Sequence, residues 1–224
     1  AGVAGYANKA GLLPATQLIF AISDGFYDGI MVFIDKEKLP SFFGWYIPIG
    51  EDLAKVGSAG DPNFAIEFMQ KNLEALKIQG HPIKSVSSSL VLGGLIKNES
   101  RRIVRVGDAG GQTKPTTGGG IVSGGMGGML AGAESAKGTF ADYDKSFSIV
   151  FGSELKLQQA LSNVYKRLST EEIMKIVSEI HKNSYRLRGD EFDFHSHLFK
   201  KLAINPSILK IAARYLPNIL SDML

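Results

Sequence analysis

The residues best suited to binding a ligand lie in one glycine-rich segment, between positions 102 and 132. From position 102 it reads Arg-Ile-Val-Arg-Val-Gly-Asp-Ala-Gly-Gly-Gln-Thr-Lys-Pro-Thr-Thr-Gly-Gly-Gly-Ile. Glycines let a backbone approach a ligand closely. We predict that residues 118–120 begin a helix, whose N-terminal N–H groups favour an anion or an electron-rich carbonyl. Asp108, at a predicted strand end, is placed to accept hydrogen bonds from hydroxyl groups. The segment therefore suits a polyol attached to an electron-poor ring.

Two common phosphate-binding loops are excluded. No stretch fits Gly-x-x-x-x-Gly-Lys-Ser/Thr, and no register fits Gly-x-Gly-x-x-Gly. A glycine-rich turn without function is disfavoured, because each glycine inside a helix costs about 1 kcal/mol relative to alanine. Four glycines recur every four residues and form what we call the glycine stripe: Gly120, Gly124, Gly128 and Gly132. The stripe predicts a helix packed closely against a sheet or a cofactor, since its apolar part is too short for a membrane-spanning dimerisation helix.

A second segment, at positions 40–48, reads Pro-Ser-Phe-Phe-Gly-Trp-Tyr-Ile-Pro and contains Trp45, the single tryptophan of the chain. Its residues alone leave two interpretations open. Alternating aromatic side chains are typical of a strand in a hydrophobic core. The same rigid apolar surface could equally line a cavity for an apolar ligand.

The pattern Gly-Asp-Ala-Gly-Gly-x-x-x-Pro-x-Thr-Gly-Gly-Gly-Ile resembles the C-terminal flavin motif of the para-hydroxybenzoate hydroxylase fold, in the form found in archaeal geranylgeranyl reductases. The resemblance implies that Asp108 binds the ribityl chain of FAD. It also implies that the backbone of residues 118–121 faces the pyrimidine edge of the isoalloxazine, where a helix N-terminus would stabilise the reduced flavin. The implied cofactor-binding residues are Gly107, Asp108, Ala109, Gly110, Pro115, Thr117, Gly118, Gly119, Gly120 and Ile121.

The aromatic segment resembles the same family, which has Pro-x-x-Tyr-x-Trp-x-Phe-Pro at this place. Phe43 and Ile47 stand where the family has Tyr and Phe. The resemblance implies that four residues line a lipid cavity beside the flavin: Phe43, Trp45, Ile47 and Pro48. The segment is also similar to the Trp-x-Trp-x-Ile-Pro motif of flavin-dependent halogenases. A halogenase or monooxygenase of the same fold is therefore one alternative, and a non-catalytic lipid- or flavin-binding module is another.

The reaction implied by the resemblance is saturation of isolated double bonds in the geranylgeranyl chains of archaeal ether lipids. Its implied partners are an isoprenoid lipid substrate and an electron donor, either a reduced nicotinamide or a ferredoxin. No proton donor is assigned, and the redox-active cysteines of the family have no counterpart, because the chain has no cysteine. The N-terminal Rossmann half, which binds the ADP part of FAD, has no counterpart either. We therefore expect this chain alone to be an incomplete catalyst.

The elements that position these residues predict an α+β fold. Strand-like runs separated by turn signals between positions 16 and 58 predict an antiparallel sheet. A helix follows from Pro62, with Asp61 as its N-cap, and then a strand over 81–92. We predict that this antiparallel substrate-binding domain with one helix occupies residues 1–98.

The remaining sequence predicts a flavin-binding segment and a helical tail. We expect a short strand at 101–106 to lead into the glycine-rich loop and helix, so that the flavin segment occupies 99–137. Residues 138–224 are predicted to form a helical region, in which Ser169 and Glu172 make a capping box. Pro217 is expected to kink or interrupt the last helix.

Composition narrows the possible partners. The net charge of +3 is small and dispersed, so no nucleic-acid partner is expected, although an anionic membrane surface would be favoured slightly. No apolar run reaches the roughly 20 residues that span a bilayer, and there is no secretory signal. We therefore expect a cytoplasmic protein whose membrane contact is at most peripheral. His195 and His197 lie near Glu191 and Asp193, but residues two apart do not share a helical face, so no metal site is expected.

Overall fold

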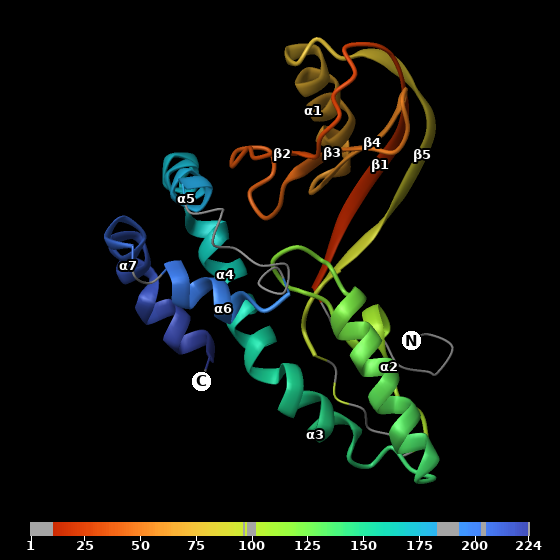
Figure 1. Cartoon of the computed structure of the whole chain (residues 1–224), viewed down its shortest axis with the longest axis vertical. Coiled ribbons are helices and arrows are strands. Elements are labelled where there is room, and N and C mark those ends of the chain that lie inside the picture. The colour runs from red at the N-terminus through yellow and green to blue at the C-terminus, as the bar shows by residue number, and fades with distance from the viewer. Residues whose placement is uncertain (1–10, 96, 98–101, 183–192, 203–204, 224) are drawn as a thin grey trace. The chain divides into compact units, whose positions relative to one another are not determined.

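A computed structural model of the chain describes residues 11–95, 97, 102–182, 193–202 and 205–223 (Figure 1). The chain divides into two compact units, which we describe separately. The sheet unit is Leu12–Leu90, and the helical unit contains Gly11 and the described residues after position 90.

The sheet unit is built on five strands in the order β2-β3-β4-β1-β5. Their bounds are β1 (Gly11–Asp24), β2 (Met31–Phe33), β3 (Gly44–Pro48), β4 (Leu53–Ala59) and β5 (Gln79–Leu92). β4 pairs antiparallel with both β1 and β3, and β3 pairs antiparallel with β2. The predicted antiparallel sheet is thus confirmed.

Helix α1 (Pro62–Ala75) packs on one face of this sheet (Figure 1). Alternation along β1 buries every second side chain on that face, as expected for a strand with one covered side. The core consists of Leu18, Phe20, Ile22, Tyr46, Ala54, Val56, Met69, Leu73 and Ile78. Burying each large apolar side chain stabilises the unit by about 1.5–3 kcal/mol.

The opposite sheet face is covered by no helix described in the sheet unit. Because Tyr46 points into the core, its neighbours Trp45 and Ile47 lie on this open face, where both are half-buried. Trp45 is opposite Gly57 on β4, and its ring lies directly over that glycine, since a Cβ on Gly57 would be 2.5 Å from Trp45 Cε2. The indole Nε1 donates a hydrogen bond to Gln17 Oε1 at 3.2 Å. The only tryptophan is therefore held flat against the sheet.

The helical unit begins with η2 (Gly107–Gly110), a single 3₁₀ turn, and α2 (Ile121–Ala136). A continuous helical segment follows, made of α3 (Tyr143–Phe147), the π-helical turn η3 (Ser148–Gly152) and α4 (Ser153–Arg167). The last helices are α5 (Thr170–Lys182), α6 (His195–Leu202) and α7 (Pro206–Met223). Stacked aromatic rings join this run to the start of α6: Tyr143, Phe147, Phe151 and Phe194.

The capping box at the start of α5 is confirmed. The Ser169 N–H donates to Glu172 Oε2 at 3.1 Å, and the Glu172 N–H donates to Ser169 Oγ at 3.2 Å. The hydrogen bond from the Ser169 backbone is the largest of the effects that hold the pKa of Glu172 below its usual range. Of the two outcomes predicted for Pro217, a kink or an interruption, the interruption does not occur, because α7 continues through this proline.

The predicted strand at 101–106 is also wrong for its described part. Residues 102–106 form no strand, and Arg101 lies outside the described residues. A strand is formed only where a neighbouring strand pairs with it, and no described strand of the sheet pairs with this segment. Ile103 is accordingly 45% exposed, although its residue type favours a buried parallel strand.

Candidate cofactor site

The Gly107–Gly110 turn is held from beneath by a buried glutamine. Gln112 is 2% exposed, and its Oε1 accepts a hydrogen bond from the Gly107 N–H at 2.8 Å. Its Nε2 donates to the Tyr143 hydroxyl at 2.6 Å. Burial raises the pKa of the Tyr143 hydroxyl, which keeps this contact uncharged. The turn is therefore anchored to α3 by one side chain.

The following residues lie tightly against the end of β5. The Thr113 hydroxyl donates to the Val91 carbonyl at 2.7 Å and accepts from the Gly93 N–H at 2.9 Å. Gly111 has a φ of +66°, and a Cβ there would lie only 2.1 Å from the Gly94 carbonyl oxygen. Pro115 is fully buried and packs against Gly93, where an added Cβ would lie only 2.3 Å from the proline Cγ. These contacts require glycine at position 111, both for its conformation and for its lack of a side chain.

Residues 114–119 form a closed loop. The Lys114 N–H donates to the Gly119 carbonyl at 2.8 Å, and the Gly118 N–H donates back to the Lys114 carbonyl at 2.8 Å. Gly118 has a φ of +69°, which a residue with a side chain rarely adopts. Thr117 stands exposed at the tip of this loop, and its hydroxyl accepts from the Gly119 N–H at 3.4 Å.

The loop leads directly into α2, and the backbone at the start of this helix is accessible. Gly120 is the N-cap and has no side-chain cap hydrogen bond, and Ile121 is 92% exposed. Asp108 is exposed beside it, since a Cβ on Gly120 would lie 3.4 Å from Asp108 Oδ1. The structure thus brings the predicted carboxylate next to a helix N-terminus whose N-cap residue, a glycine, has no side chain of its own to cap it. An acceptor for hydroxyl groups and donors for a carbonyl are therefore adjacent, which is the combination that a flavin with its ribityl chain requires.

The packing of α2 differs from the prediction made from the glycine stripe. A Cβ would meet nothing within 4 Å at Gly128 or Gly132, whereas at Gly127 it would lie 2.2 Å from Gln112 Oε1 and 3.0 Å from the Tyr143 hydroxyl. Residues four apart advance about 40° around a helix at each step, so a four-residue repeat drifts off one face within three steps. The stripe is closely packed only near its start, at Gly120 and Gly124, and the tightest contact lies outside it.

We expect Gly127→Leu to destabilise the chain by about 1–3 kcal/mol, because the new side chain must displace Gln112 and break its contacts with Gly107 and Tyr143. The matched control is Gly128→Leu, whose side chain enters open space on the same helix. The free energy of unfolding of the 224-residue chain in denaturant measures both variants. Equal losses at the two positions would show that the described packing of α2 is wrong.

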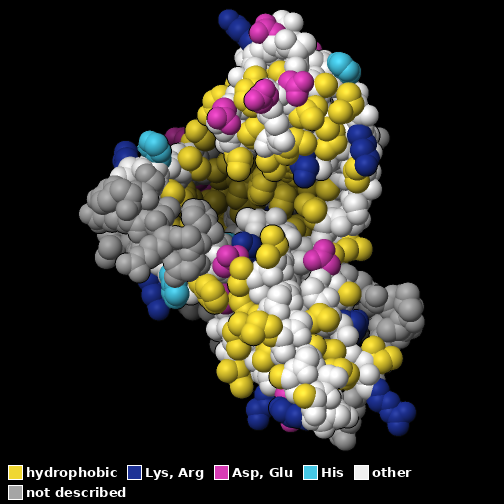
Figure 2. Space-filling model, turned by 45° about the vertical axis from the view of Figure 1, so that its right-hand side comes forward, with side chains coloured by type: hydrophobic (Ala, Val, Ile, Leu, Met, Phe, Trp, Pro, Cys, Tyr) yellow, Lys and Arg dark blue, Asp and Glu magenta, His cyan; other side chains and the backbone are white. Residues whose placement is uncertain are grey.

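The other face of α2 is apolar and exposed. Met129 is 71% exposed, Val122 is 42% exposed, and the side chain of Ile121 is almost fully exposed. The surface in the lower part of Figure 2 is mostly hydrophobic or uncharged, with several of its basic side chains near its lower end.

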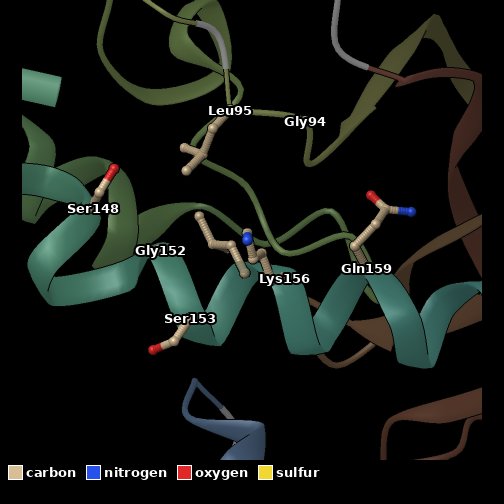
Figure 3. A pocket seen from close by; sticks show the side chains of 8 residues that line it. Gly94, Leu95, Ser148, Gly152, Ser153, Lys156 and Gln159 are labelled. Atoms are coloured by element: carbon tan, nitrogen blue, oxygen red, sulfur yellow. The ribbon is translucent and has the colours of Figure 1, made fainter. Parts of the chain in front are cut away.

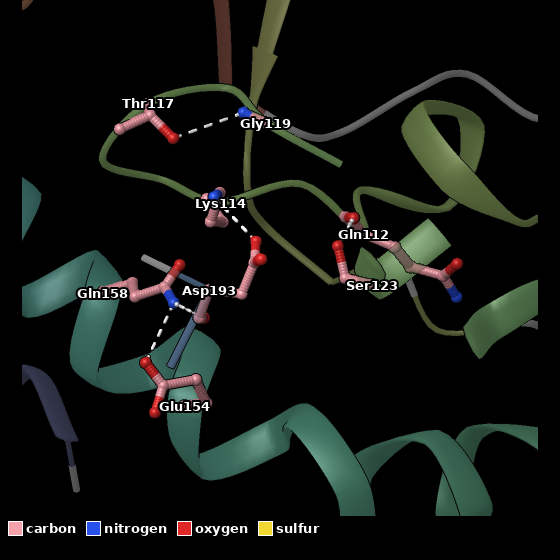
Figure 4. A network of polar contacts seen from close by, with 8 residues as sticks. All are labelled: Gln112, Lys114, Thr117, Gly119, Ser123, Glu154, Gln158 and Asp193. Carbon is pink, nitrogen blue, oxygen red and sulfur yellow. Dashed lines mark hydrogen bonds and ion pairs between the residues drawn. The ribbon is translucent and has the colours of Figure 1, made fainter. Parts of the chain in front are cut away.

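A polar network connects the loop to the helical tail (Figure 4). Lys114 Nζ donates to Asp193 Oδ1 at 2.8 Å, and the Asp193 carbonyl accepts from Gln158 Nε2 at 3.0 Å. The same Nε2 donates to Glu154 Oε1 at 2.9 Å. Glu154 is 5% exposed, and its carboxylate accepts from the Ser196 N–H in the first turn of α6. The network therefore joins the loop to α4 and α6.

Two pockets adjoin this site within the helical unit. One, of about 600 Å³, is mainly apolar and lies between the 94–95 segment and the η3–α4 junction (Figure 3). Its lining residues are Gly94, Leu95, Ser148, Gly152, Ser153, Leu155, Lys156 and Gln159. The other, of about 460 Å³, is lined by Gly110 and Gln112 together with residues of α3.

The predicted substrate-binding residues lie in the sheet unit. Trp45 and Ile47 share the open sheet face, and Pro48 ends β3 at the position opposite Ala54. Phe43 precedes the strand and stacks on Phe42 with ring centroids 4.2 Å apart. The predicted cofactor-binding residues belong to the helical unit, where they lie in one continuous loop and helix start.

Several groups that shape the site were not predicted from the sequence. Gln112 and Tyr143 are 31 residues apart, and Lys114 and Asp193 are 79 apart, so no local pattern connects either pair. Among the described residues, no three His, Cys, Asp or Glu side chains form a group that could hold a metal ion; Glu191 lies outside them. None of the described helices has the length and hydrophobicity needed to span a membrane.

Comparison with known proteins places these features in context. No known family's sequence profile matches the chain. It is 30% identical over 194 residues to an uncharacterized protein of Methanocaldococcus jannaschii, an alignment that covers 82% of the chain and 49% of that protein. It is 26% identical over 192 residues to the digeranylgeranylglycerophospholipid reductase of Methanothrix thermoacetophila, covering 79% of the chain and 48% of the relative. The chain thus spans about half the length of the curated relatives it matches.

The fold is also shared with a solved structure. The geranylgeranyl bacteriochlorophyll reductase-like protein of Thermoplasma acidophilum superposes with a TM-score of 0.68 at 20% identity, covering 98% of the chain and 56% of that protein. The fold class predicted from the sequence and the resemblance of its motifs are both confirmed. In sequence and in fold, the chain is geranylgeranyl reductase-like.

Proposed function

We propose that residues 107–121 hold the ribityl chain and the pyrimidine edge of FAD, in an oxidoreductase that saturates the double bonds of geranylgeranyl chains in archaeal ether lipids. The observation that carries this proposal is the position of the exposed Asp108 carboxylate beside Gly120, the glycine N-cap of α2. The names of the related reductases supply the substrate class.

Each part of the segment has a distinct role in this proposal. The Asp108 carboxylate accepts hydrogen bonds from ribityl hydroxyls, and the N–H groups at the start of α2 donate to the carbonyl and nitrogen acceptors of the flavin edge. The glycines from Gly118 to Gly120 keep that backbone free of side chains, so that the ring can approach it. Gln112 and Thr113 position the segment from beneath without contacting the cofactor.

Bound, reduced FAD would supply a hydride to one carbon of the alkene, and the other carbon must receive a proton. The helix N-terminus favours the reduced cofactor, because its positive end lies where negative charge develops on the ring. An isolated alkene accepts hydride poorly, so the isoprenoid chain must be held in a fixed position and shielded from water. We assign this positioning to the open sheet face around Trp45, whose half-buried apolar side chains match an isoprenoid.

We expect Trp45→Ala to reduce the rate of prenyl-lipid reduction at least tenfold while flavin content stays close to normal. The indole covers Gly57 and presents a flat apolar surface, and a misplaced substrate can lose about 100-fold in rate. Turnover of a geranylgeranyl lipid and the flavin absorbance per protein measure the two effects separately.

The matched control is Tyr46→Phe, on the same strand but the opposite, core-facing side. It removes the hydroxyl that donates to the Tyr27 carbonyl at 3.0 Å, so it perturbs the sheet without touching the open face. Turnover lost equally in the control and in Trp45→Ala would mean that Trp45 acts through the stability of the sheet and does not contact substrate.

A further inference from the structure

The side chain of Lys114 lies across the loop that we propose faces the flavin. A Cβ on Gly119 would be 2.8 Å from Lys114 Cε and 3.4 Å from its Nζ, so the ammonium lies directly beside the backbone that leads into α2. Only 17% of this side chain is exposed. Figure 4 shows Lys114 below Gly119, with Asp193 on its other side. A positive charge is thus fixed next to the start of the helix.

The backbone of Lys114 is fixed by the loop itself. The Lys114 N–H and carbonyl close the loop through their hydrogen bonds with Gly119 and Gly118. The backbone of Lys114 is therefore held beside Gly119, and its ammonium is held by the hydrogen bond to Asp193.

The counterion of Lys114 is held from the helical tail. Asp193 Oδ1 accepts the 2.8 Å hydrogen bond from Nζ, and the side chain of Asp193 is 29% exposed. Its carbonyl is fixed by Gln158, which is completely buried and is itself held by Glu154. Partial burial strengthens such an ion pair, because water screens it less than it screens a surface pair.

We propose that Lys114 and Asp193 set the reduction potential of the flavin, with the lysine raising it and the aspartate limiting that rise. This inference rests on the proposed function, since it assumes that residues 107–121 bind flavin. A cation beside the pyrimidine edge stabilises the negative charge that reduction places there, and a neighbouring carboxylate offsets part of this effect. The two residues act on the flavin through their charges, and neither needs to contact the substrate.

The test measures midpoint potentials of bound FAD in a polypeptide that includes these 224 residues and binds the cofactor. Lys114→Gln should shift the equilibrium between oxidised and reduced flavin on the order of tenfold toward the oxidised form, which is a fall of about 30 mV for a two-electron couple. Asp193→Asn should shift it in the opposite direction by a smaller factor. Lys114→Arg retains the charge and should keep the potential close to normal.

Lys137→Gln is the matched control, because it removes an ion-paired lysine from the far end of α2, where Lys137 Nζ lies 2.6 Å from Glu134. Its potential should not change. Potentials that stay constant in both Lys114→Gln and Asp193→Asn, or that move in the same direction, would overturn the inference while leaving the flavin site intact. If Lys114→Gln does not retain flavin, the rise expected in Asp193→Asn decides the question by itself. A parent protein that binds no flavin would overturn the inference and the proposed function together.

Discussion

Asp108→Ala should weaken FAD binding by roughly ten- to a hundredfold. The carboxylate is exposed beside Gly120, and we assign to it the ribityl hydroxyls of the cofactor. A hydrogen bond to a charged group contributes about 1.5–3 kcal/mol, and each 1.4 kcal/mol is a tenfold change in affinity. Flavin fluorescence quenching gives the dissociation constant in a polypeptide that includes these 224 residues and binds FAD.

Asp108→Asn separates charge from shape, because an amide retains one acceptor oxygen but loses the negative charge. It should bind FAD with intermediate affinity. Asp52→Ala, at an exposed turn of the sheet unit, is the control for removing a carboxylate elsewhere. If Asp108→Ala holds FAD as tightly as this control, the assignment of Asp108 to the ribityl chain is wrong.

The 224-residue chain on its own should bind FAD roughly a thousandfold more weakly than a polypeptide that adds a dinucleotide-binding half. The sequence contains no Gly-x-Gly-x-x-Gly turn, so it offers no site for the pyrophosphate and adenosine. Two charge-assisted hydrogen bonds that are not made cost about 3–6 kcal/mol, which corresponds to that loss of affinity.

Riboflavin, FMN and FAD distinguish this explanation from a chain that is simply misfolded. If residues 107–121 contact only the ring and the ribityl chain, the isolated chain should bind all three with similar, weak affinities. The longer polypeptide should prefer FAD strongly. Tight binding of FAD by the isolated chain, with clear discrimination against riboflavin, would contradict the prediction.

Local sequence patterns predicted the elements well where the pattern itself decides the structure. The strand-like runs between positions 16 and 58 and the capping box of Ser169 and Glu172 depend on neighbours within a few residues, and both are present. The residues of the glycine-rich loop were identified because positive φ and close backbone contacts can be satisfied only by glycine, as at Gly111.

The failures have a common physical cause, since each depended on contacts that the local sequence does not specify. Residues 102–106 have the composition of a strand, but a strand needs a neighbouring strand, and no described strand pairs with this segment. The glycine stripe suggested one packed face, whereas burial of Gln112 under Gly127 determines which side of α2 faces inward. The Lys114–Asp193 pair depends on the fold of 79 intervening residues and could not be found from spacing.

The most direct test of the account is reduction of a geranylgeranyl ether lipid by a polypeptide that includes this chain and binds FAD, with dithionite as the electron source. Mass spectrometry of the lipid follows the addition of two hydrogens per double bond. We predict FAD-dependent saturation that falls in Asp108→Ala, because of lost cofactor, and in Trp45→Ala, despite retained cofactor. A yellow, reducible protein that leaves the lipid unchanged would contradict the proposed reductase and favour a flavin-binding module, and a protein that binds no flavin would contradict the cofactor site itself.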